Sequence, residues 1–169
     1  RPDSGISPQK WQVRTNVEAE GRPADRAPAR FGKHAVLKSS LISAGSDIRG
    51  TVINSVLAPG VVVEEGAVVK DSIVFTDCHI KKNAIVDLSI FDKKVTVGAG
   101  SHVGHGEGHA IANVMEPTHL YSGITLIGKG AQVPGKTTIG RNCVIDSKVD
   151  ENMFLSEDIA DGQSVLIQS

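Results

Sequence analysis

Three consecutive segments of 17 residues decide the fold of this chain: SVLAPGVVVEEGAVVKD (55–71), SIVFTDCHIKKNAIVDL (72–88) and SIFDKKVTVGAGSHVGH (89–105). When the segments are aligned on their first residue, four columns agree in chemical type across the three copies. The columns are Val63, Ile80 and Val97; Gly66, Asn83 and Gly100; Ala67, Ala84 and Ser101; and Val69, Val86 and Val103. This agreement indicates an internal structural repeat of one coil per segment.

A shorter period of six residues runs inside the repeat. The step from Val63 to Val69 recurs in each copy, and it continues after residue 126. The later aliphatic positions are Ile127, Val133, Ile139 and Ile145, and the small residues that follow the first three by four positions are Ala131, Thr137 and Cys143. The pattern is therefore an aliphatic–x–x–x–small–x hexad.

This hexad predicts an all-β fold, a left-handed parallel β-helix with three hexads in each coil. Its left-handedness is unusual, because most parallel crossovers are right-handed. The aliphatic residue of each hexad is expected to point inward, and Gly or Asn at a corner tolerates a left-handed backbone. Ten residues are predicted to be buried in this way: Val63, Val69, Ile80, Val86, Val97, Val103, Ile127, Val133, Ile139 and Ile145.

The repeat also divides the chain. We expect an N-terminal arm over residues 1–33, with Trp11 and Val13 as its anchors, and a β-helix domain over 34–169 whose coils cover roughly 36–150. Within that domain, residues 104–122 break the hexad and are predicted to leave the solenoid as a loop insertion. The tail from residue 146 is expected to cap the last coil with a strand, because an open sheet edge is a liability.

Composition excludes several classes of function. Lys and Arg total 18 against 19 Asp and Glu, so no strong field favours nucleic acid or an anionic membrane as a partner. No apolar run is long enough for a transmembrane helix or a signal peptide. Only two cysteines are present, which fits a reducing compartment, and we expect a cytoplasmic protein.

One segment matches a nucleotide-binding motif. Residues 130–137, GAQVPGKT, satisfy the phosphate-loop pattern GxxxxGK[ST]. However, the residues after Lys136 form a poor helix start, and Val133 and Ile139 already belong to the hexad. We therefore expect no nucleotide site here.

No catalytic, cofactor-binding or metal-binding residue is assigned from the residues alone. The cluster His102, His105, His109 and His119 could supply a zinc site or an acyl-transfer base, but solvated loop residues explain it better. The glycines at 104, 106 and 108 form half of a dinucleotide fingerprint with no helix after it. Cys143 lies in the small inward column, whereas Cys78 is expected in a turn, where it could be exposed.

Several stretches resemble the C-terminal domain of glucose-1-phosphate adenylyltransferase (ADP-glucose pyrophosphorylase). They are PTHLYSGITLIGK (117–129) with Pro134, IGRNCVI (139–145), INSVL (53–57), DSIV (71–74), WQVRT (11–15) and PAR (28–30). The looping-out after Gly106 and Glu107, with Asn113 and Pro117, is similar to an insertion in that family. The resemblance covers essentially the whole chain.

The resemblance implies a fragment whose catalytic domain is absent, since the sequence starts at Arg1 and lacks that family's glycine-rich loop, magnesium-binding aspartates and sugar-phosphate lysine. The parent enzyme would use Mg and ATP to convert glucose 1-phosphate to ADP-glucose and pyrophosphate for glycogen biosynthesis. The implied partners are the catalytic domain, further copies in a homotetramer, and small sugar-phosphate or nucleotide effectors. No effector residue is assigned, because the tail of 24 residues contains only Lys148 as a basic side chain.

Two other functions remain open at this point. One is a hexapeptide-repeat acyltransferase with a loop histidine as its base. The other is a non-catalytic regulatory homologue of the adenylyltransferase.

Overall fold

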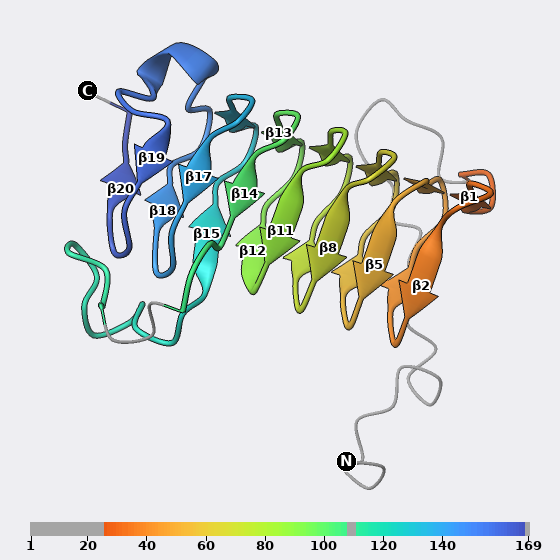
Figure 1. The fold of residues 1–169 in the computed structure, drawn as a ribbon, viewed down its shortest axis with the longest axis horizontal. Coiled ribbons are helices and arrows are strands. Elements are labelled where there is room, and N and C mark those ends of the chain that lie inside the picture. Colours follow the sequence, from red (N-terminus) through yellow and green to blue (C-terminus); the bar gives the residue numbers. More distant parts are fainter. Residues whose placement is uncertain (1–25, 108–110, 168–169) are drawn as a thin grey trace, which may run out of the picture.

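The computed structural model describes residues 26–107 and 111–167, and it contains a parallel β-solenoid whose coils follow one another along a single axis (Figure 1). Three sheets run along its length, and every strand pairs in parallel with its counterparts in the coils on either side. The predicted all-β, left-handed parallel β-helix is confirmed.

Each sheet collects one strand from each of the first six coils. Sheet A consists of β1 (Arg30–Phe31), β4 (Asp47–Ile48), β7 (Val62–Val63), β10 (His79–Ile80), β13 (Thr96–Val97) and β16 (Gln132–Val133). Sheet B consists of β2 (Val36–Lys38), β5 (Thr51–Ile53), β8 (Val68–Lys70), β11 (Ile85–Asp87), β14 (His102–Val103), β17 (Thr138–Ile139) and β19 (Asp158–Ile159). Sheet C consists of β3 (Leu41–Ile42), β6 (Val56–Leu57), β9 (Ile73–Val74), β12 (Ser89–Phe91), β15 (Thr125–Ile127), β18 (Val144–Ile145) and β20 (Ser164–Val165).

The residues of each sequence column pair with one another in neighbouring strands, so the columns give the register of the sheets. Ile80 pairs with Val63 on one side and with Val97 on the other, and Val86 pairs in the same way with Val69 and Val103. All ten residues predicted to point inward are buried. Burial of one Val or Ile side chain stabilises a fold by roughly 1.5–3 kcal/mol, so the stacked columns supply the core.

The predicted corner column has the expected backbone. Gly66, Asn83 and Gly100 have φ angles of 74°, 58° and 70°. A Cβ atom added to Gly66 would collide with the Asn83 side chain one coil away. Gly66 is therefore required both by its conformation and by close packing.

The two ends of the solenoid and its interruption differ from the regular coils. β1 lies within the segment predicted as the arm and pairs with β4. The expected anchors Trp11 and Val13 lie outside the described residues. No strand occurs between β14 and β15 in the described part of the chain, and β19 and β20 cover β17 and β18 as a cap.

Sheet A ends one coil earlier than the other two sheets. At this position the chain forms a 3₁₀ helix, η1 (Glu151–Met153), which arches over the C-terminal end of the solenoid (Figure 1). Among the residues that the structure describes, no helix is long and apolar enough to cross a membrane.

Candidate functional site

The loop insertion is held at its start by a buried arginine. The guanidinium of Arg141 donates from Nε to the Gly106 carbonyl at 2.8 Å and from Nη2 to the Asp87 carboxylate at 3.1 Å. Its backbone N–H donates to the Asp161 carboxylate at 2.6 Å. Charge-assisted bonds of this kind are stronger than neutral ones, so Arg141 fixes the point where the loop leaves the prism.

Two asparagines hold the returning part of the loop. The Asn113 amide donates to the Asn142 carbonyl at 2.8 Å, and its oxygen accepts from the backbone N–H groups of Met115 and Glu116. Asn142 in turn accepts from the Gly123 N–H at 2.7 Å. Both side chains are fully buried, so their hydrogen bonds tie the loop to the last coils.

The described histidines of the cluster lie in two separate places. The rings of His102 and His105 are in edge contact with centroids 4.6 Å apart. His119 lies instead beside Glu116, at 3.3 Å on an exposed turn, and His109 falls outside the described residues. Among residues 26–107 and 111–167, no group of three His, Cys, Asp or Glu side chains could hold a metal ion.

The histidine pair also lacks the geometry of a general base. Burial lowers the pKa of His102, and the nearby His105 and Arg141 lower it further against the opposing effect of Asp87. Within the described chain, no carboxylate hydrogen-bonds to either ring to orient it. A catalytic base normally requires such an orienting partner.

The phosphate-loop match consists of two ordinary solenoid corners. Gly130 and Lys136 have φ angles of 72° and 62°, and β16 lies between them. Strand β17, not a helix, follows Lys136, so the backbone N–H groups do not form a phosphate cradle at a helix start.

Both cysteines are buried, which makes the expectation of an exposed Cys78 wrong. Cys78 is 1% exposed, because it occupies the same inward position as Val61 and Val95 in the neighbouring coils. Burial raises the pKa of the Cys78 thiol to about 12 and that of the Cys143 thiol to about 11. Neither thiol is a nucleophile at neutral pH.

The outer face of sheet C carries an uninterrupted apolar column. The first residue of each strand faces outward there, except in β12 and β15, where the middle residue does so. The column, which we call the C column, consists of Leu41, Val56, Ile73, Ile90, Leu126 and Val144, paired in register. Over its second half lies a hollow of about 250 Å³, lined by Phe75, Ile90, Leu126 and Val144 among others.

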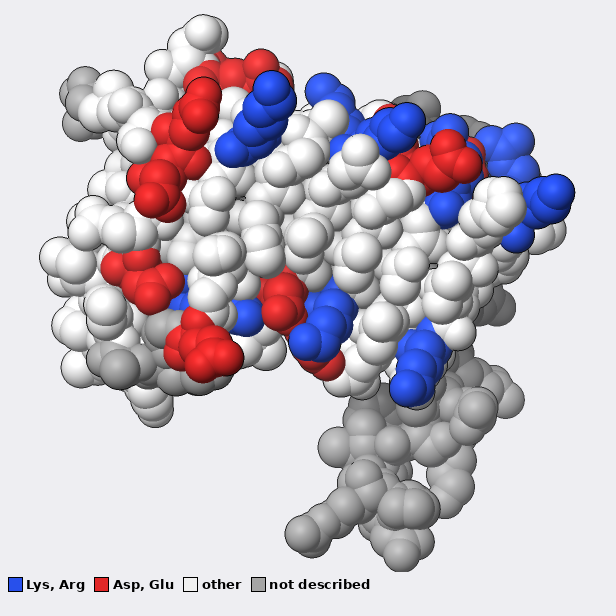
Figure 2. All heavy atoms as spheres, in the orientation of Figure 1, with Lys and Arg blue, Asp and Glu red and all other residues white. Residues whose placement is uncertain are grey.

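The other two faces differ in character. Outward positions on sheet A include Arg30, Asp47, His79 and Gln132, and those on sheet B include Thr51, His102 and Asp158. Figure 2, which views sheet B, shows charged side chains gathered at the upper and lower margins and an uncharged middle. Only sheet C presents a purely aliphatic row from its first coil to its sixth.

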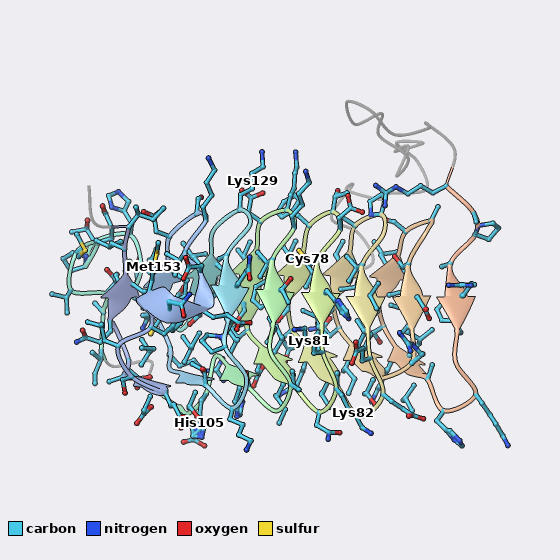
Figure 3. The ribbon with its side chains drawn as sticks, turned by 90° about the horizontal axis from the view of Figure 1, so that it is seen from above. Cys78, Lys81, Lys82, His105, Lys129 and Met153 are labelled. Atoms are coloured by element: carbon cyan, nitrogen blue, oxygen red, sulfur yellow. The ribbon has the colours of Figure 1, made fainter. Side chains whose placement is uncertain are left out.

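A row of lysines borders the C column at the corner between sheets C and A. This lysine ridge consists of Lys93, Lys94, Lys129 and Lys148. Its turns stack directly, since the Gly130 N–H donates to the Lys93 carbonyl and the Lys148 N–H to the Lys129 carbonyl. Within the described residues none of the four makes an ion pair, and Figure 3 shows Lys129 pointing away from the prism at the edge opposite Lys82.

A larger pocket opens at the C-terminal end of the solenoid. Its volume is about 860 Å³, and Met153, Leu155, Ile159 and Val165 provide much of its apolar lining. Figure 3 shows Met153 with η1 over this end. The pocket exists because η1 swings outward where a strand of sheet A would otherwise close the coil.

The C column and the lysine ridge are functional surfaces that the hexad did not predict. Val62, Val68 and Ile85 are also outward aliphatic residues, but they lie on sheets A and B. The C column could have been found from one signal in the sequence: in every third hexad, an aliphatic residue comes directly before the inward-facing one.

Comparison with known proteins gives consistent matches. The family model GlmU-like, C-terminal hexapeptide, matches residues 22–127. A glucose-1-phosphate adenylyltransferase of Acetivibrio thermocellus is 38% identical over 98% of this chain, and one of Thermomicrobium roseum is 41% identical over 97%. The chain spans only 37% of the length of each of these relatives.

A solved structure supports the fold alone. A protein from Desulfovibrio desulfuricans, named as an acetyltransferase, matches with a TM-score of 0.55 at 16% identity over 68% of this chain and 22% of its own.

Proposed function

The chain belongs to the GlmU-like C-terminal hexapeptide family, and from that premise we propose that it is the C-terminal assembly and regulatory domain of a glucose-1-phosphate adenylyltransferase. The longer protein would form ADP-glucose and pyrophosphate from ATP and glucose 1-phosphate, with Mg, in glycogen biosynthesis. Its chemistry would take place outside the solenoid.

One observation carries this proposal: similarity to two such enzymes, at 38% and 41% identity, extends over nearly all of this chain but over little more than a third of theirs. Among the described residues, both cysteines are buried in the core and Lys136 lies at a solenoid corner. The described residues also provide two surfaces for contact, namely the lysine ridge and the apolar C-terminal end.

Assembly and regulation fit these surfaces. A solenoid with exposed apolar rows and an open end is suited to contact with its own catalytic domain and with further copies, up to a tetramer of the parent. Sugar-phosphate or nucleotide effectors that bind where the solenoid meets the catalytic domain would change the equilibrium between the more active and the less active state of the enzyme. They would do so by altering that contact. We propose a cytoplasmic location for the parent.

The first experiment assays the isolated chain with ATP, glucose 1-phosphate and Mg. We expect no pyrophosphate release, because the sequence has none of the catalytic motifs of the family. Pyrophosphate release that Lys136→Ala abolishes would restore residues 130–137 as a nucleotide site and overturn the assignment.

The second experiment removes the residues equivalent to 34–169 from the longer enzyme. We expect loss of tetramers in sedimentation and loss of the response to sugar-phosphate activators. A truncated enzyme that remains tetrameric and responds normally would exclude the regulatory role.

The acyltransferase alternative is not supported further, since the acetyltransferase match is a likeness of fold at 16% identity. The non-catalytic regulatory homologue differs from our proposal only in the upstream domain. Activity of the longer protein distinguishes the two.

A further inference from the structure

The sequence WQVRTNVEAE (11–20) has a strict period of two. Every second residue is apolar or Thr, and the residues between them are polar: the first set is Trp11, Val13, Thr15, Val17 and Ala19, and the second is Gln12, Arg14, Asn16, Glu18 and Glu20. Alternation of this kind is typical of an extended segment that buries one side and exposes the other. The hexad of the solenoid does not account for it.

The C column is a surface of matching chemistry and length. Its residues are aliphatic in six successive coils, and Leu41, Val56 and Ile73 are 55%, 43% and 43% exposed. Neighbouring strands lie about 4.8 Å apart, so the column is about 24 Å long, whereas ten extended residues reach about 33 Å. One side of residues 11–20 can therefore cover the whole column.

The chain enters the solenoid at the edge of this face. The Arg26 guanidinium donates to both carboxylate oxygens of Asp77, at 2.6 and 3.2 Å, and the Ala27 carbonyl accepts from the Gly45 N–H at 2.6 Å. Both contacts lie on the corner between sheets C and A, and the pair is largely buried. Arg26, where the described chain begins, is thus held beside sheet C in the third coil.

We propose that residues 11–20 bind in an extended conformation along the C column of the same chain, with the Trp11 indole in the hollow over Ile90, Leu126 and Val144. The lining of the hollow combines apolar side chains with Asp92 and Asp146. Its volume of about 250 Å³ is below the usual size of a small-molecule site and suits one large aromatic side chain that also has a polar N–H group. The segment between Trp11 and Arg26 can extend to about 50 Å, while the hollow lies within about 15 Å of the Asp77 coil along the axis.

The tether favours this occupant over a second copy. A segment joined by a short linker has an effective concentration near the millimolar range, far above a micromolar protein solution. Burial of an indole and two valines against aliphatic side chains adds the hydrophobic contribution.

Trp11 is the only tryptophan, so its fluorescence reports the segment directly in the full 169-residue chain. We expect a blue-shifted emission maximum and slow quenching by acrylamide, both unchanged on dilution. Leu126→Glu places a carboxylate in the hollow and should shift the emission to the red, with a severalfold rise in the quenching constant.

A matched variant serves as the control. Val68→Glu makes the same kind of change on the outer side of sheet B. It should leave Trp11 unchanged, and circular dichroism should show that every variant keeps its strands.

Three results would overturn the proposal. The first is a solvent-exposed Trp11 in the unmodified chain. The second is a shielded Trp11 that Leu126→Glu does not affect while the strands remain intact. The third is shielding that disappears on dilution, which would identify a second copy as the occupant of the column.

Discussion

At the residue scale, the small inward column shows how the solenoid treats buried polar groups. Thr125 and Thr137 are both fully buried, but only one of them is satisfied. The Thr125 hydroxyl donates to the Gly140 carbonyl at 2.7 Å, whereas the Thr137 hydroxyl has no hydrogen-bond partner within the described structure. A buried hydroxyl without a partner costs free energy, so the same residue type has opposite effects at the two positions.

We therefore expect Thr137→Val to raise the free energy of unfolding by about 1 kcal/mol, because it removes an unpaired hydroxyl at nearly constant shape. Thr125→Val is the matched control and should lower it by about 1–3 kcal/mol. Urea unfolding measures both. Destabilisation by Thr137→Val would show that its hydroxyl has a partner, such as a buried water.

The two thiols predict a pH dependence of stability. The folded-state pKa values are about 12 for Cys78 and about 11 for Cys143, against 9.0 for the free thiol, so the unfolded chain loses these protons first as pH rises. The stabilisation is fully present below about pH 9 and decreases as pH rises towards these folded values. Urea midpoints measured on both sides of pH 9 should fall less steeply in a Cys78→Ala, Cys143→Ala variant. If the urea midpoint falls equally steeply with pH in the unmodified chain and in the double variant, the raised pKa values of the two thiols are contradicted.

At the scale of the element, each strand is too short to be stable alone. Strands of two or three residues hold their place because an inward side chain stacks on those of the coils before and after it, as Val133 does on Val97. The stability of a solenoid is approximately the sum of such neighbour contacts. Inward and outward positions of one strand should therefore differ sharply in their tolerance of charge.

Val133→Asp should lower the free energy of unfolding by about 3–5 kcal/mol, because the carboxylate would be buried without a partner. Gln132→Asp, one residue earlier on the exposed side of β16, should change it by no more than about 0.5 kcal/mol. Chemical denaturation followed by circular dichroism compares the two. Similar losses for both would mean that β16 does not have this in-and-out orientation.

At the scale of the whole molecule, the three sheets end unequally. β19 and β20 present unpaired edges at the C-terminal end, beside a pocket of about 860 Å³ lined by Leu155 and Val165. Such edges and apolar side chains favour association unless something covers them.

We predict that the isolated chain self-associates at micromolar concentration, with dimers as the main species. Sedimentation velocity over a dilution series tests this, and Leu155→Lys should weaken the association without loss of folded structure, since Leu155 is 95% exposed. A chain that is strictly monomeric throughout the series would contradict the prediction.

The sequence by itself determined the coil. The hexad specified which side chains point inward and where corners fall, because both depend on residues within one or two turns of the chain. The ten inward aliphatic residues and the corner at Asn83 were predictable for this reason.

Only the tertiary structure decided which outward residues share a face and which distant groups meet. The alignment of Ile90 with Leu126 depends on how much chain loops out between β14 and β15, and the Arg141–Asp87 pair joins positions 54 residues apart. The exposure of Cys78 was misjudged for the same reason, since its burial depends on contacts with the coils before and after it. A local pattern sets the direction of a side chain, but its neighbours across coils are set by the stacking of the whole solenoid.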